Sequence, residues 1–188
     1  MKLILLSAAV LATFGLPAPA ATISIHAPTA ANGSFDVVVQ ATDLWAGRDP
    51  STDGIISYGF DIAIGNPFLL TFDGADSGPL FDPATTEPGT DVFGAASGFF
   101  ISDPVPEPLI LAILHFTRIG VGSVDITISS DLSNLFQGLQ FLNEPFAEPI
   151  AGTVDIADAP EPATFVIAAL GLAALGIRRR KRPLDRMP

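Results

Sequence analysis

Between residues 22 and 156, apolar side chains alternate with small or polar ones in short runs. This period of two predicts β-strands with one buried face, and helical periodicity is hard to find. The alternating segments are 22–27, 35–41, 55–64, 69–72, 92–96, 109–117, 124–129 and 153–156. Turn-forming Gly, Pro and Asn residues separate them, so we predict about eight strands in an all-β, antiparallel β-sandwich, either immunoglobulin-like or jelly roll.

The alternation also predicts which side chains face the core. We expect Val37, Val39, Ile126 and Ile128 to be buried, with Asp125 on the opposite face of its strand. In the segment 55–64 one face is shared by five large side chains: Ile56, Tyr58, Phe60, Ile62 and Ile64.

The first 20 residues have the pattern of a signal peptide. A basic start, Met1-Lys2, precedes the apolar run 3–16 and the small residues Ala18 and Ala20. We predict a signal helix that signal peptidase removes after Ala20, so that the mature chain begins at Ala21. The alternative is a retained N-terminal anchor. The apolar run is short for a membrane span, however, and it is followed by Pro17 and Pro19, which break a helix.

The tail, residues 159–188, combines three parts in a fixed order. A Pro160-Glu161-Pro162 triplet comes first, the apolar run 163–177 follows, and five basic residues end the sequence pattern: Arg178, Arg179, Arg180, Lys181 and Arg182. We predict a short transmembrane helix over 163–177, with the basic cluster as a cytoplasmic stop. A plain C-terminal anchor helix is the alternative.

This order resembles the PEP-CTERM sorting signal of exported proteins in Gram-negative bacteria. The resemblance implies a chain held transiently in the inner membrane, with its C-terminus in the cytoplasm. It also implies processing by an exosortase, a cysteine transpeptidase of that membrane, and release to the cell surface or extracellular matrix. The internal triplet Pro106-Glu107-Pro108 lacks the long apolar run and the basic cluster, so we expect it to carry no signal.

Residues 21–158 remain between the two signals, enough for one domain with one core. The chain has no cysteine, so no disulfide holds this domain. Its two basic residues face eighteen acidic ones, a formal charge of −16. Nucleic acid and anionic lipid surfaces are therefore poor partners.

The order of pieces in this domain resembles that of cohesin modules. The shared pieces are Gly33-Ser34-Phe35, Gly54-Ile55 through Phe60-Asp61, Leu70 to Phe72, and Leu114 to Val124. The resemblance implies a cohesin-like jelly-roll sandwich over residues 21–158 that contacts protein or carbohydrate, such as an extracellular polysaccharide.

Candidate catalytic residues are few. Without cysteine there is no thiol nucleophile, and neither His26 nor His115 lies near a Gly-x-Ser-x-Gly motif. We therefore expect a non-enzymatic protein. The alternatives are a secreted polysaccharide hydrolase, which would need a carboxylate pair in a cleft, and a calcium-dependent adhesin.

The calcium alternative rests on two acidic segments. Asp49, Ser51 and Asp53 have the spacing of the first half of a calcium loop, but Phe60 stands where an EF-hand has its bidentate Glu. Asp73 and Asp76 form the second segment. A plain polar turn is the alternative to a calcium site, so no cofactor is required.

Trp45 is the only tryptophan and borders a polar loop. In that position its ring could stack on a sugar as a ligand contact, or it could pack against the core.

Overall fold

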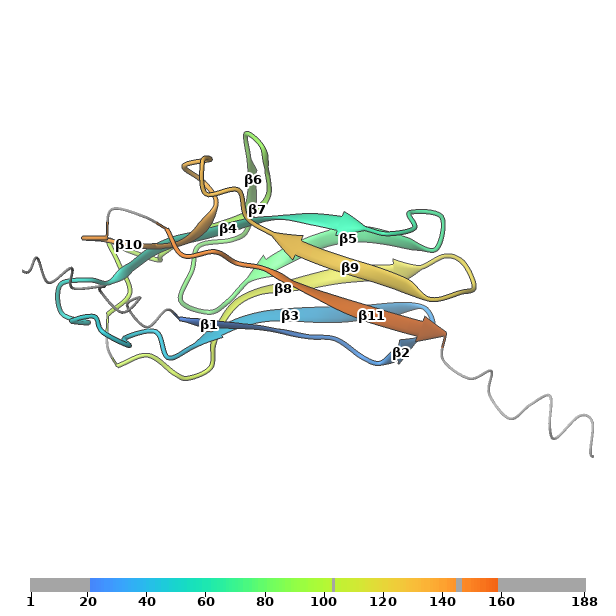
Figure 1. Cartoon of the computed structure of the whole chain (residues 1–188), viewed down its shortest axis with the longest axis horizontal. Helices are drawn as coiled ribbons and strands as arrows, with labels where there is room; N and C mark the ends of the chain where they lie inside the picture. The colour runs from blue at the N-terminus through green and yellow to red at the C-terminus, as the bar shows by residue number, and fades with distance from the viewer. Residues whose placement is uncertain (1–20, 103, 145–146, 159–188) are drawn as a thin grey trace, which may run out of the picture.

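The computed structural model describes residues 21–102, 104–144 and 147–158, and this part of the chain contains strands and no α-helix (Figure 1). The strands are β1 (Thr22–His26), β2 (Ala30–Ala31), β3 (Ser34–Thr42), β4 (Ile55–Ile64), β5 (Leu70–Ser77), β6 (Thr85–Glu87), β7 (Thr90–Ala95), β8 (Leu109–Arg118), β9 (Val124–Ser129), β10 (Gly138–Phe141) and β11 (Gly152–Asp158).

The strands form two sheets that pack as a sandwich (Figure 1). One sheet has four strands in the order β1-β3-β8-β5. The other has the order β2-β11-β9-β4-β7-β6, with β10 pairing with β4 beside this path. Neighbouring strands are antiparallel except β2 and β11, which run parallel. The predicted all-β sandwich is confirmed.

The core lies between the sheets and consists of the side chains that the alternation placed inward. Val37, Val39, Ile126 and Ile128 are fully buried, as predicted. Asp125 and Thr127 point away from that side, since β9 alternates between buried and more exposed positions.

One polar contact in the interior joins the two sheets. The Tyr58 hydroxyl on β4 lies 2.8 Å from Ser77 Oγ at the end of β5. Burial raises the pKa of Tyr58 to about 12, although the Ser77 contact lowers it. The phenol is therefore neutral and hydrogen-bonded at neutral pH, which is how a buried hydroxyl is tolerated.

Three strands were missed by the sequence prediction: β2, β6 and β10. The first has two residues, too few for any period, and β6 is the polar triplet Thr-Thr-Glu. β10 begins at Gly138, whose φ of 89° no alternation reveals.

The sequence prediction also ended the last strand too early. The strand predicted over 153–156 continues as β11 to Asp158, and Ala157 and Asp158 pair with β2. That pairing spans more than a hundred residues of sequence, so a local pattern cannot show it.

The expected signal helix (1–20) and transmembrane helix (163–177) lie outside the described residues. Inside them, no helix has the length and apolarity to cross a bilayer.

Candidate functional site

The solvent side of the sheet β1-β3-β8-β5 is here called the open face. Alternation along each strand brings one set of side chains to this side. The members of the open face that matter here are Asp36, Val38, Gln40, Asp73, Asp76, Ile110, Ile113, His115 and Thr117.

A histidine lies between two carboxylates on the open face. His115 Nδ1 on β8 is 2.8 Å from Asp36 Oδ1 on β3, and its Nε2 is 3.2 Å from Asp76 Oδ2 on β5. The hydrogen bond to Asp36 and the contact with Asp76 raise the pKa of His115, while partial burial lowers it. Both ring nitrogens can donate only when the imidazole is protonated, so this pair of carboxylates favours the cation.

A second polar row runs parallel to the first. Thr117 Oγ1 donates to Asp73 Oδ2 at 2.6 Å and lies 3.0 Å from Ser34 Oγ. Beyond His115 the face becomes apolar, where Val38 and Ile113 are paired across β3 and β8. The open face thus has a half-buried apolar centre with polar residues around it, the composition of a protein contact surface.

The outer side of the other sheet is partly covered by the chain itself. The segment 131–137 crosses β4 so closely that a Cβ on Gly59 would lie 1.9 Å from the Phe136 carbonyl oxygen. Phe136 packs edge-on against Phe93 of β7, and Gln137 donates to Asp61 at 2.8 Å.

The predicted calcium loop is folded as a polar turn. Asp49 Oδ1 accepts hydrogen bonds from the Ser51 amide and hydroxyl at 2.9 and 2.6 Å, and Asp53 Oδ2 accepts one from the Asp49 amide. These bonds from Ser51 lower the pKa of Asp49. Three of the four carboxylate oxygens of Asp49 and Asp53 thus accept hydrogen bonds within the loop.

Asp73 and Asp76 lie on strand β5, not in a loop, and contact different partners, Thr117 and His115. Across the described residues, no group of three or more His, Asp or Glu side chains is arranged to hold a metal ion. The two acidic segments are therefore not brought together, and the expectation of calcium gains no support from this geometry.

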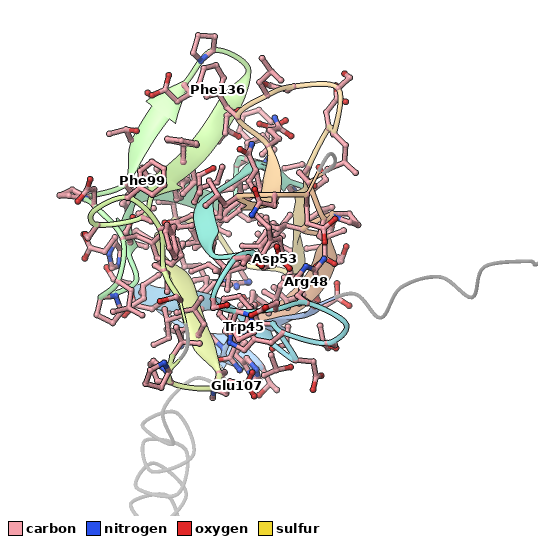
Figure 2. The ribbon with its side chains drawn as sticks, turned by 90° about the vertical axis from the view of Figure 1, so that its left-hand side faces the viewer. Trp45, Arg48, Asp53, Phe99, Glu107 and Phe136 are labelled. Carbon is pink, nitrogen blue, oxygen red and sulfur yellow. The ribbon has the colours of Figure 1, made fainter. Side chains whose placement is uncertain are left out.

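Trp45 occupies a packing position. Its ring is half-buried against the core and meets Phe141 edge-on at 6.4 Å between ring centroids. Figure 2 shows Trp45 with Arg48 and Asp53 at one end of the sandwich. A sugar contact through Trp45 stays a prediction.

Arg48 connects several residues at this end of the sandwich, and the sequence analysis did not single it out. Its guanidinium lies 4.0 Å from the Phe141 ring centroid, pairs with Glu148, and is 3.6 Å from Glu144. Glu148 in turn accepts a hydrogen bond from the Ala21 amide at 2.8 Å. The only sequence clue was that Arg48 is one of two basic residues in an acidic domain.

A hollow of about 400 Å³ opens beside β10. Its lining includes Leu132, Leu135, Phe141 and one carboxylate, Glu144. Leu135 is largely exposed.

Comparison with known proteins gives two findings. The tail matches the model of the PEP-CTERM protein-sorting motif over residues 158–181. Among curated proteins, none matches the sequence.

The sandwich is similar to solved cohesin structures. One is a cohesin module from a family 33 glycoside hydrolase of Clostridium perfringens, with 11% identity, a TM-score of 0.53, and coverage of 74% of this chain and 98% of that one. Another is a type II cohesin domain from the cellulosome of Acetivibrio cellulolyticus, with 12% identity, a TM-score of 0.48, and coverage of 73% and 95%. At these identities the likeness concerns the fold alone, and it rests on the first structure. The chain therefore combines a match to the PEP-CTERM protein-sorting motif with a domain whose fold is similar to that of a cohesin module.

Proposed function

We propose that this chain is an exported, non-enzymatic protein of the cell surface or extracellular matrix. Signal peptidase removes residues 1–20, and the apolar run 163–177 then holds the chain in the inner membrane with Arg178–Arg182 in the cytoplasm. An exosortase processes the tail near Pro160-Glu161-Pro162. The released sandwich makes contact with a protein or with extracellular polysaccharide.

The observation that carries this proposal is the position of the sorting motif. The match begins at residue 158, and the last strand, β11, ends at Asp158. Every strand pairing among the described residues is therefore complete before the Pro-Glu-Pro triplet begins. Cleavage beyond that point would remove none of the described strands, which supports cutting of the tail from a folded domain.

The open face supports a role in contact with another macromolecule. Its centre, formed by Val38, Ile110 and Ile113, is half-buried, and the charged side chains of Asp36 and Asp76 lie at its border, 61% and 77% exposed. An apolar centre with a hydrated rim is typical of protein interfaces. The structural neighbours are cohesin modules, which by analogy favours contact over catalysis.

The two alternatives have weaker support in the described residues. Glycoside hydrolysis uses a pair of carboxylates, whereas Glu144 is the one carboxylate in the lining of the hollow beside β10. A calcium-dependent adhesin would need free oxygens, whereas the Asp49 loop uses its own as hydrogen-bond acceptors.

The tail is tested by two variants in the native host. Glu161→Ala removes the acidic residue of the triplet, and replacing Arg178–Arg182 by serines removes the cytoplasmic stop. Both should leave unprocessed chain in the membrane fraction. Glu107→Ala, in the internal triplet (Figure 2), is the matched control and should be released normally. Normal release of both tail variants would contradict the proposal.

The contact role is tested on the released protein. Ile113→Glu places a charge in the centre of the open face, while Ala63→Glu places the same charge on an exposed position of β4. We expect Ile113→Glu to lower the fraction retained by the cell surface and matrix, and Ala63→Glu to leave it unchanged. Equal retention of the two variants would show that the open face does not make this contact.

A further inference from the structure

Three exposed apolar side chains gather at one end of the sandwich. Phe68 in the β4–β5 loop is 85% exposed, and Ile119 and Val121 in the β8–β9 loop are 59% and 87% exposed. We call these three residues the apolar tip. Figure 1 shows both loops at the end where β11 finishes.

The two loops of the apolar tip form one surface because they are bonded to each other. The amides of Ile119 and Gly120 donate to the Leu69 carbonyl oxygen at 2.9 and 3.3 Å. A Cβ on Gly120 would lie 2.9 Å from the Phe68 carbonyl oxygen, so the approach requires glycine. The exposed side chains therefore project from a fixed platform.

Arg118 joins this platform to the end of the last strand. Its Nε donates to the Gly120 carbonyl at 3.1 Å, and its guanidinium pairs with Asp158 at 2.5 Å. The Gly122 amide donates to the same carboxylate at 2.7 Å. The hydrogen bond from Arg118 is the main cause that lowers the pKa of Asp158, so the contact holds at neutral pH. The point where the tail leaves the sandwich is thus fixed beside the apolar tip.

The sequence leaves little distance between that point and the bilayer. Four residues, 159–162, separate Asp158 from the apolar run that begins at Ala163. A fully extended chain covers about 3.6 Å per residue, so Ala163 lies within about 18 Å of Asp158. With the run inserted in a membrane, the end of the sandwich that carries the apolar tip has to stay near the lipid surface.

We propose that the anchored chain stands end-on on the inner membrane, with Phe68, Ile119 and Val121 inserted among the lipid headgroups. The inference rests on the proposed membrane anchoring of the tail. Aromatic and branched aliphatic side chains gain free energy at the boundary between headgroups and acyl chains. The contact would hold the Pro160-Glu161-Pro162 triplet at the membrane surface, where a membrane-bound processing enzyme acts.

Charge favours a neutral lipid surface, and not a second copy of the chain, as the surface that the apolar tip contacts. Each sandwich carries a formal charge of −16, so two copies repel one another. At the tip the cation of Arg118 is already paired with Asp158, and the Asp125 carboxylate lies next to Gly65 in the β4–β5 loop. The contact therefore relies on the apolar side chains and should be strongest on zwitterionic lipid.

The chain has no cysteine, which permits one labelled position at a time. Val121→Cys and Phe99→Cys each receive an environment-sensitive fluorophore. Phe99 is 77% exposed and lies at the opposite end of the sandwich, which faces the viewer in Figure 2. The tail-bearing chain is reconstituted in phosphatidylcholine vesicles that contain a lipid with a nitroxide quencher just below the headgroup.

We expect quenching at position 121 to exceed that at position 99 by at least about twofold, because insertion places the label among the quenchers. Adding Phe68→Ser and Ile119→Ser should abolish the difference, while the chain still floats with the vesicles. Equal quenching at both positions, or none at 121 in floated chain, would overturn the inference and leave the anchoring intact. A chain that does not float with the vesicles would overturn both the inference and the membrane anchoring. A spectral shift of the label at position 121 in detergent that grows with protein concentration would show that the apolar tip mediates self-association, which would also overturn the inference.

Discussion

Glu148→Gln is expected to destabilise the sandwich much more than the same change at Glu144. Glu148 pairs with Arg48, and the two side chains are 11% and 8% exposed. Removing one partner of a nearly buried ion pair leaves the other charge uncompensated, at a cost of about 3–5 kcal/mol. Glutamine still offers an oxygen to Arg48 and to the Ala21 amide, so the lower end, about 3 kcal/mol, applies.

Glu144→Gln is the matched control. The Glu144 side chain is 37% exposed and its carboxylate lies 3.6 Å from Arg48 Nε. Because Glu144 is exposed to water and its contact with Arg48 is long, this pair should contribute about 0–1 kcal/mol, as surface pairs do. The same chemical change next to the same arginine should therefore give two different results.

Thermal unfolding followed by circular dichroism measures the difference. In a domain of this size 1 kcal/mol moves the midpoint by roughly 2–8 °C, so Glu148→Gln should lower it by about 10 °C and Glu144→Gln by a few degrees at most. A double-mutant cycle with Arg48→Met should show that the two losses at 48 and 148 are not additive. Equal midpoints for the two glutamine variants would refute the argument.

The remaining predictions concern the N-terminus, the open face and the interior. A chain that begins at Ala21 has a charged amino group close to Glu148, whose Oε2 lies 2.8 Å from that nitrogen. This chain should have a higher melting temperature than one extended by Ala20, and Glu148→Gln should reduce the difference between the two. The pKa of His115 is raised in the folded protein. Its contribution to stability is therefore complete below the unfolded pKa of about 6.5 and is lost as the pH rises through the higher pKa of the folded state. The unfolding midpoint should fall over that pH range, and His115→Asn should make this fall smaller. Tyr58 is the only tyrosine and its pKa is raised to about 12. Folded protein should therefore show almost no phenolate absorbance at pH 10, where a free tyrosine is about half ionised, and half-ionisation at that pH with the fold intact would contradict the burial. Gly59→Ala should displace the segment 131–137, because the new Cβ would meet the Phe136 carbonyl oxygen; loss of protection from hydrogen exchange at Gln137 would show it.

Alternation of side chains predicted the core strands well because each strand buries one face. Val37, Val39, Ile126 and Ile128 are inside for that reason. The same rule failed for β6, a polar triplet that pairs with the neighbouring strand β7, and for β10, which pairs with β4 far away in the sequence. Long-range pairing leaves no local period.

The candidate sites were harder to predict than the fold. The spacing of Asp49, Ser51 and Asp53 suggested oxygen ligands, but short polar side chains in a turn bond first to the nearby backbone. The opposite case is His115, for which the sequence indicated no partner. Only the register of β3, β8 and β5 places Asp36 and Asp76 beside it.

In the proposed function the chain is exported and cut at both ends around an intact sandwich. Mass spectrometry of the intact protein secreted by its native host tests both cuts at once. We predict a chain that starts at Ala21, ends near Pro160-Glu161-Pro162 and lacks the run 163–177. A secreted protein whose mass still includes residues 163–188 would contradict it.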